Sequence, residues 1–366
     1  MAGIQFRPCG DFRSSYRADT TIFDDRFSRN FVIGLVVVLA LIPIPTVFDL
    51  GFDVIDRYWT NLLINIGFLS IAALGLNILV GFTGQISIGH AVFFGFGAFS
   101  TVFIHENTGI PAFFTIPLAG LLTAAVGLIF GVPAARLKGL YLAIATLAAQ
   151  FILENFFARA DWFSGGTHGA RAPRVELFGF EFRDAQAYWW LVLGYVVVMF
   201  LLATNLMRSR DGRALIAVRD HYLSAEIMGV NLTKYRILSF GIASFYAGIG
   251  GALFAHYNRF VQVETFNIFF SIQFLAMVII GGLGSVMGTI MGVTFIVLLP
   301  EVTEGLAGML RGTELAESLN LEVGLNFMKE MAIGLAIILF LIFEPDGLAH
   351  RWRQIKAYWK LYPFSY

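Results

Sequence analysis

The stretch GFTGQISIGHAVFFGFGAF, residues 81–99, decides how this sequence is read, because it places polar side chains among glycines in a strongly apolar chain. Thr83, Gln85, Ser87 and His90 lie next to apolar runs long enough to cross a bilayer. A glutamine and a histidine are costly in such surroundings, so they need a reason.

Two reasons fit the residues. On a continuous helix, Ser87 and His90 would share one face, and Gln85 and Gly89 would share a neighbouring one. The glycines also permit an unwound turn, whose free backbone groups must be satisfied by protein or by a watery cavity. The polar side chains therefore either line a pathway or bond to another helix, and the residues alone leave both interpretations open.

Composition indicates an all-α polytopic membrane protein. Hydrophobic residues make up 57% of the 366 residues and charged residues 14%, which is too apolar for a soluble core. The formal net charge of zero argues against a nucleic-acid partner. No glycine-rich loop precedes a lysine and Ser/Thr, so ATP is not expected to bind this chain. The single Cys9 excludes an internal disulfide.

Apolar runs long enough for helices predict about ten transmembrane segments. The runs are Phe31–Phe48, Trp59–Val80, Ile86–Ile104, Ala112–Ala135, Leu140–Phe157, Trp189–Met207, Ile237–Tyr257, Phe266–Ile280, Val286–Pro300 and Met328–Phe343. The eighth and ninth runs are short and are separated by GGLGS, so broken or tilted helices are expected there.

The distribution of Lys and Arg predicts that both termini are cytoplasmic. Basic residues gather in the N-terminal extension 1–30, around 136–138, in the segment 208–236 and in the basic tail 351–366. The loops expected outside are mixed or acidic. The extension has no apolar core, so the first helix of the transmembrane domain, 31–350, is expected to direct insertion.

Small residues recur at a helical spacing of four, which predicts close packing between membrane helices. The rows are Ser87, Ala91 and Gly95; Ala243, Ala247, Gly251 and Ala255; and Gly284, Gly288 and Gly292. The similar turns GFTG and GGLG, about 200 residues apart, could also be the trace of an internal duplication.

Ionisable residues within the apolar runs are few. His90 is the clearest, while Glu154 and His256 are expected near helix ends, within reach of interfacial water. A proton- or sodium-coupled carrier usually needs acidic groups deep in its spans, so the energy for any transport is expected to come from elsewhere.

The segment 208–236 is too polar to span the membrane and has helical patches with basic residues between them. Such a helix could lie on anionic lipid. The small residues around SAEIMG favour docking of another protein instead.

Several motifs together resemble LivM-type permeases, the membrane subunits of branched-chain amino-acid ABC importers. They are GLNILVGFTGQISIGHAVFFGFGAF (75–99), GRALIAVRDHYLSAEIMGVNLTKYRILSFGIASFYAGIGGAL (212–253), VIIGGLGSVMGTIMG (278–292) and EPDGL (344–348). The resemblance places Gln85, Ser87 and His90 near the substrate pathway. It assigns Ser224, Ala225, Glu226 and Gly229 to a cytoplasmic coupling helix that meets ATPases. The outer loop reads SGGTHGA, with Ser164 where the family commonly has threonine, so no role is assigned to it.

The resemblance implies a bacterial inner-membrane permease that catalyses no covalent chemistry and holds no metal or cofactor. Its expected partners are a LivH-type sister permease, two cytoplasmic ATPase subunits that bind ATP, an external substrate-binding protein and membrane lipid. Branched-chain or other hydrophobic amino acids are the expected solutes. A same-family permease for urea, short amides or small carboxylic acids is the alternative, and a self-sufficient secondary carrier is a further one.

Overall fold

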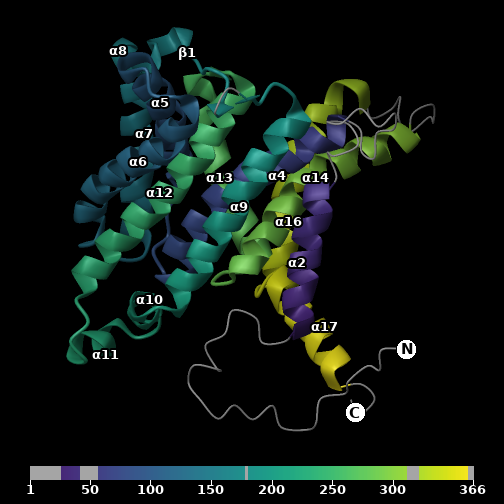
Figure 1. The fold of residues 1–366 in the computed structure, drawn as a ribbon. Coiled ribbons are helices and arrows are strands. Elements are labelled where there is room, and N and C mark those ends of the chain that lie inside the picture. The colour runs from purple at the N-terminus through teal and green to yellow at the C-terminus, as the bar shows by residue number, and fades with distance from the viewer. Residues whose placement is uncertain (1–25, 42–56, 178–179, 311–320, 362–366) are drawn as a thin grey trace.

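The computed structural model describes residues 26–41, 57–177, 180–310 and 321–361, and most of them are helical. Each of the ten predicted runs overlaps a helix in this part of the chain, although residues 42–48 of the first run lie outside the described residues (Figure 1). These helices are α2 (Arg26–Leu41), α4 (Arg57–Asn77), α5 (His90–Thr108), α6 (Ala112–Ala134), α7 (Leu140–Arg159), α9 (Ala185–Arg208), α12 (Leu232–Asn258), α13 (Ile268–Gly281), α14 (Val286–Leu310) and α16 (Leu321–Phe343). Most of the predicted extension 1–30 lies outside the described residues.

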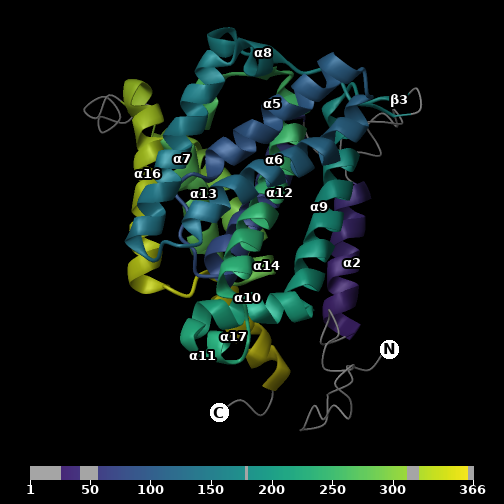
Figure 2. The same ribbon diagram turned by 90° about the vertical axis from the view of Figure 1, so that its left-hand side faces the viewer.

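Shorter elements gather at the two ends of the helical bundle. At one end lie α10 (Arg210–Asp220), α11 (Tyr222–Ile227) and α17 (Leu348–Leu361), beside the start of α2 (Figures 1 and 2). The other end carries α8 (Asp161–Ser164), η2 (Gly166–His168), η3 (Val263–Phe266) and four strands. Strand β1 (Ala170–Arg171) pairs antiparallel with β4 (Phe260–Val261), and β2 (Glu176–Leu177) pairs antiparallel with β3 (Phe180–Glu181).

Six helices of the described chain are long and apolar enough to cross a membrane. They are Arg57–Phe82, Ala112–Ala134, Leu140–Arg159, Ala185–Arg208, Leu232–Asn258 and Val286–Gly305. A seventh span results if the pair Glu330–Phe343 and Leu348–Tyr358, bent by 51°, is counted as one. Val32–Leu41 and Ile268–Gly281 are apolar but shorter. The protein is thus an all-α polytopic membrane protein.

Helix α14 ends later than the sequence predicts. The predicted run stops at Pro300, since proline removes a backbone donor, but the helix continues to Leu310 with Pro300 inside it. Near this proline, the Thr303 hydroxyl donates to the Pro300 carbonyl, with an Oγ1–O distance of 2.7 Å. The carbonyl that Pro300 leaves without a helical donor is that of Ile296, and membrane helices tolerate such a proline through local adjustment and neighbouring helices.

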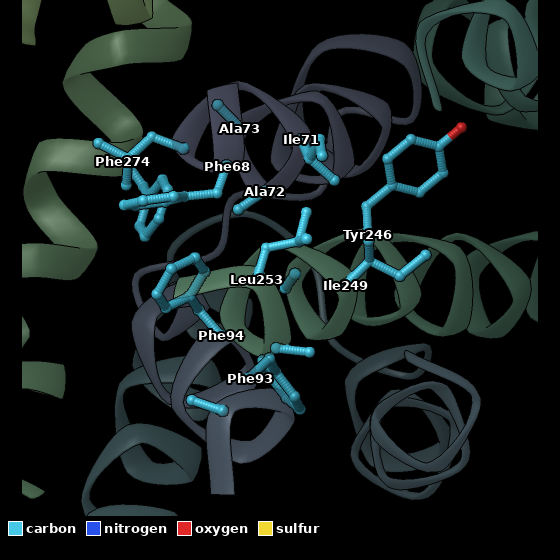
Figure 3. Packing of buried hydrophobic residues seen from close by; sticks show 14 of the residues in the cluster. Phe68, Ile71, Ala72, Ala73, Phe93, Phe94, Tyr246, Ile249, Leu253 and Phe274 are labelled. Carbon is cyan, nitrogen blue, oxygen red and sulfur yellow. The ribbon is translucent and has the colours of Figure 1, made fainter. Parts of the chain in front are cut away.

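The core lies where α4, α5, α12 and α13 meet. Figure 3 shows Phe68 and Ile71 of α4 beside Phe94 of α5, Leu253 of α12 and Phe274 of α13. The Phe94 ring lies 5.6 Å from that of Phe274 and 6.3 Å from that of Phe68, between ring centroids. Because lipid is as apolar as these side chains, close packing holds such helices together better than removal from water does.

Several glycines make this close packing possible. A Cβ atom built on Gly251 of α12 would lie 1.8 Å from the Phe94 carbonyl oxygen, and one on Gly95 would lie 2.6 Å from the Phe266 ring. On α14, a Cβ at Gly288 or Gly292 would lie within 2.3 Å of a backbone oxygen of α13. Glycine at these positions lets the backbones of neighbouring helices touch.

Two members of the predicted rows do not lie on helices. Gly284 belongs to the turn before α14 and has a φ of 76°, which favours glycine. Ser87 precedes the start of α5. Their spacing of four therefore does not produce a continuous helical stripe.

Candidate functional site

The polar stretch that follows α4 is not helical. Helix α4 leads into a π-helical turn, η1 (Ile78–Phe82), and residues 84–89 have no helical structure until α5 begins at His90. The predicted start at Ile86 is wrong, and so is the predicted helical face shared by Ser87 and His90. Gly84 has a φ of 70°, and a Cβ at Gly89 would lie 2.3 Å from the Thr146 carbonyl oxygen, so the glycines permit the unwinding.

Backbone groups of this segment find partners within the protein. The amides of Gly84 and Gln85 donate to carbonyl oxygens of Val80 and Leu79, both at 3.1 Å. The Ile88 amide donates to the Thr146 hydroxyl of α7 at 3.0 Å. A non-helical backbone is tolerated at membrane depth only with such partners.

The start of α5 is held by a second set of side chains. The Ala91 amide donates to the Ser271 hydroxyl of α13 at 2.9 Å, and Ser271 donates in turn to Gln150 Oε1 of α7 at 3.0 Å. Gln150 Nε2 donates to the Phe266 carbonyl at 2.6 Å. Thr146, Gln150 and Ser271 were not singled out from the sequence, because their role depends on contacts between distant segments.

Gln85 is almost fully buried and reaches α12. Its Nε2 donates to the Ser239 hydroxyl at 2.6 Å and to the Thr83 hydroxyl at 3.1 Å. Its Oε1 is buried and has no hydrogen-bond partner among the described residues. A buried acceptor of this kind calls for an explanation, since most such atoms are paired.

His90 is also buried, but it bonds in a different direction. Its Nε2 lies 2.9 Å from the Ala72 carbonyl oxygen of α4, and because a carbonyl only accepts, this nitrogen carries the hydrogen. The ring meets Phe274 edge to face at 5.4 Å. Ser87, three residues before His90, is buried as well. The segment thus holds all three predicted pathway residues, but Gln85 and His90 both bond to other helices of the same chain.

Asn77, at the end of α4, joins the two glycine turns. Its Nδ2 donates to the Ser285 carbonyl at 2.9 Å and to the Thr289 hydroxyl at 2.6 Å, and its Oδ1 accepts from the Gly284 amide at 2.9 Å. The turns GFTG and GGLG therefore lie side by side although about 200 residues separate them. A side-chain amide deep in an apolar run is a sequence signal for Asn77, but Asn61 and Asn65 in the same run carry it too.

Replacing Asn77 with leucine is expected to destabilise the protein by about 1–3 kcal/mol, because the partly buried Gly284 amide loses its acceptor and the buried Thr289 hydroxyl loses a donor. Thermal unfolding in detergent measures the loss. Asn65→Leu is the matched control, since Asn65 on the same helix donates only to the Asn61 carbonyl one turn away. Equal melting temperatures for the two variants would contradict the joining role of Asn77.

The segment 208–236 forms two short helices followed by the start of α12. Ser209 caps α10 by accepting from the Gly212 amide at 3.2 Å, and α11 follows after His221. Ser224 and Glu226 are exposed, whereas Ala225 is buried against its own chain. A docking surface at α11 would therefore not include the Ala225 side chain.

Three large apolar side chains project from α11 and its end instead. Leu223 is 61% exposed, Ile227 87% and Met228 86%. Gly229 follows with a φ of 83° and open space around its Cα, so it ends the helix without touching another segment. The sequence pattern emphasised the small residues here, but in the structure the exposed surface is made by the large ones.

At the opposite end, His256 is buried rather than close to water. Its Nδ1 donates to the Pro173 carbonyl at 2.9 Å, and its Nε2 lies 2.9 Å from the Thr101 hydroxyl of α5. The expectation that His256 reaches interfacial water is wrong, because the loop after β1 covers it.

Comparison with known proteins adds what geometry alone does not. The sequence profile of the family described as "Branched-chain amino acid transport system / permease component" matches residues 58–342. This chain belongs to that family. The matched range contains the non-helical segment 84–89, both glycine turns and the segment 208–236.

Curated members of the permease family align over most of the chain. The high-affinity branched-chain amino acid transport system permease protein LivM of Salmonella typhimurium is 29% identical over 76% of this chain and 67% of its own length. A probable LivM of Methanocaldococcus jannaschii is 27% identical over 64% of this chain and 66% of its own length. The LivH permease of Salmonella typhimurium is 21% identical over 77% and 91%. No solved structure matches the chain.

The family assignment agrees with the fold. Its members are transport components rather than enzymes, and the apolar helices make this permease a multi-pass protein of the inner (plasma) membrane.

Proposed function

We propose that this chain is the permease subunit of an ATP-driven importer for branched-chain or other hydrophobic amino acids. The profile match over residues 58–342 is the observation that carries the proposal. The LivM relatives are named for the same class of solute. The permease itself performs no covalent chemistry, and the energy comes from ATP bound by its partners.

The proposed topology has ten crossings with both termini in the cytoplasm. Helices α10, α11 and α17 lie at the end where α2 begins, and the loops between α7 and α9 lie at the other end (Figure 2). The basic segment 208–236 and the described part of the basic tail, 351–361, belong to the first end, which supports a cytoplasmic position for it. The shorter helices α2 and α13 then cross together with their neighbours rather than alone.

Two cytoplasmic ATPase subunits, a LivH-type sister permease and an external binding protein complete the proposed importer. One ATPase docks on α11, where Leu223, Ile227 and Met228 are exposed beside the polar Ser224 and Glu226. An apolar centre with a polar rim is typical of protein interfaces. Closure of the ATPases moves α11, and the bundle alternates between outward and inward access.

Gln85, Ser87 and His90 are proposed to lie near the substrate path. The free Gln85 Oε1 supports this role, since an amino acid carries an ammonium group that needs buried acceptors. The unwound backbone beside it supplies further polar groups. The bonds from Gln85 to Ser239 and from His90 to Ala72 fix these side chains in position.

Replacing His90 with leucine is expected to lower stability by about 1 kcal/mol, the value of one lost hydrogen bond. If His90 also borders the path, the KM for leucine uptake rises severalfold at equal amounts of assembled importer. Uptake by vesicles, normalised to assembled protein, measures this. His90→Gln, which keeps a donor, should restore stability. An unchanged KM in both variants would leave His90 with a structural role only.

The most direct experiment is affinity purification of the tagged chain from its native membrane. A second permease and two ATPases should accompany it, and the reconstituted complex should take up leucine, isoleucine or valine only with ATP. Uptake that is competed by urea or small carboxylates but not by leucine would favour the alternative substrates. Uptake by the isolated chain under a proton gradient would overturn the proposal.

A further inference from the structure

Arg219 links the segment 208–236 to the two glycine turns. It lies in the last turn of α10, and its Nη1 donates to the carbonyl oxygen of Gly81, in the π-helical turn η1 that follows α4. Its Nε donates to Asp220 Oδ1 at 2.8 Å, which balances the charge. A charged donor on a carbonyl makes a stronger hydrogen bond than a neutral one.

The glycines around Arg219 leave room for its side chain. A Cβ at Gly84 would lie 3.0 Å from Arg219 Cγ, and a Cβ at Gly284 would lie 3.1 Å from Arg219 Nη1. Both glycines have positive φ, 70° and 76°. The guanidinium therefore lies where the turn after α4 and the turn before α14 come closest, and Asn77, at the end of α4, joins the same two turns.

The position of Arg219 along the chain connects this junction to α11. Only Asp220 and His221 separate Arg219 from the first residue of α11. Lys138, in the loop between α6 and α7, lies 4.0 Å from the centre of the Tyr222 ring, which steadies the start of α11. A displacement of α11 is thus passed to Arg219 over a very short length of chain.

Arg219 differs in this respect from the other arginine of α10 with a described backbone bond. Arg213 Nη1 donates to the Arg208 carbonyl at 3.0 Å, five residues away, and so stays within its own segment. Arg219 reaches a carbonyl 138 residues away. This contrast provides a control on the same helix.

We propose that Arg219 is the positioning residue that transmits movement of α11 to both glycine turns. The turn after α4 leads directly to Gln85 and His90, and the turn before α14 leads into the second half of the bundle, so one side chain moves both together. The inference rests on the proposed docking of an ATPase at α11. Arg219 touches no substrate in this scheme and acts through the turns.

A distance measurement tests the link. In a Cys9→Ser background, spin labels at His221→Cys and Leu283→Cys, which are both exposed, report on the end of α10 and the second turn. In the complete importer, the distance should stay narrow and constant between the ATP-free state and the state trapped with ATP and orthovanadate. In Arg219→Met it should shift or broaden on trapping. In Arg213→Met the distance between the labels should stay narrow and constant, as in the parent protein.

Two results would overturn the inference. One is a distance in Arg219→Met that stays narrow and constant in both states. The other is a distance that already changes on trapping in the parent. If Arg219→Met fails to assemble, Arg219→Lys serves instead, because it keeps the charge and the stem but shortens the reach to the Gly81 carbonyl. For Arg219→Lys, too, a distance that stays narrow and constant in both states would overturn the inference.

Coupled transport supplies a second readout. Arg219→Met should keep ATP hydrolysis within about twofold while uptake per ATP hydrolysed falls at least tenfold, and Arg219→Lys should recover part of the ratio. A merely structural role would lower hydrolysis and uptake together, in proportion to the assembled complex, and would contradict the inference. Absence of ATPases from the purified parent would instead refute the proposed function, so the two failures are distinguishable.

Discussion

Replacing Ile227 with aspartate is expected to release the ATPase subunits and to lower ATP-dependent uptake about a hundredfold or more. Ile227 is 87% exposed and makes no contact that the fold needs, so the bundle should keep its stability. Central apolar anchors at protein interfaces contribute about 2 kcal/mol or more each, and burying an unpaired carboxylate in their place adds a further penalty. Co-purification of the ATPases and uptake by vesicles measure the effect.

Ile355→Asp is the matched control for that substitution. Ile355 lies on α17, at the same end of the molecule, and is 50% exposed. The Ile355→Asp substitution introduces the same negative charge at the same end of the molecule, but away from α11. If Ile355→Asp releases the ATPases and Ile227→Asp does not, the docking surface has been assigned to the wrong helix.

Replacing Gly251 with valine is expected to prevent stable folding of the bundle. The new Cβ would lie 1.8 Å from the Phe94 carbonyl oxygen, so α5 and α12 would have to move apart. Overpacking typically costs about 1–3 kcal/mol, and a clash with backbone rather than a flexible side chain places this one at or above the upper end. The yield of monodisperse protein in detergent and its melting temperature should both fall sharply.

Gly194→Val tests whether the helix contact is responsible. Gly194 lies in α9, is exposed, and has no atom within 4 Å of a Cβ built on it. The same loss of a helical glycine there should change stability by no more than about 0.5 kcal/mol. A similar melting temperature for both variants would show that Gly251 is not a contact between helix backbones.

The helical architecture could be predicted from the sequence, because bilayer thickness imposes a length on each apolar run. All ten runs overlap helices, although within the described residues only six helices are long and apolar enough to span by themselves. The family was also recognised correctly from the motifs around residues 75–99 and 212–253, since these combine spacing and residue type over many positions.

The start of α5 could not be predicted from the sequence. The apolar run begins at Ile86, but the helix begins at His90, because Thr146 and Ser271 satisfy backbone amides that a helix would otherwise pair. These partners come from helices about 60 and 180 residues further along the chain. The local sequence pattern around residues 86–90 therefore gives no information about Thr146 and Ser271.

Which side chains of α11 face outward could not be predicted from the sequence either. Ala225 was expected on the docking surface but faces the protein, while Ile227 and Met228 face outward, since a helix as short as α11 has no repeating pattern. The roles of Asn77 and Arg219 depend on bringing together segments more than 130 residues apart. Whether Gln85, Ser87 and His90 meet substrate stays a prediction.

The glycine contacts also decide which parts of the permease move as one. Where backbone touches backbone, as at Gly97 and Gly248 or at Gly251 and Phe94, no side chain lies between the helices to change rotamer and let them slide. Helices α5 and α12 are therefore expected to move together, and so are α13 and α14, whose backbones meet at Gly281 and Gly288. Between the two pairs the contacts are made by side chains, such as the Ser271 hydroxyl that accepts from the Ala91 amide and the Phe274 ring beside Phe94, so any relative movement within the bundle is expected at this seam rather than inside either pair.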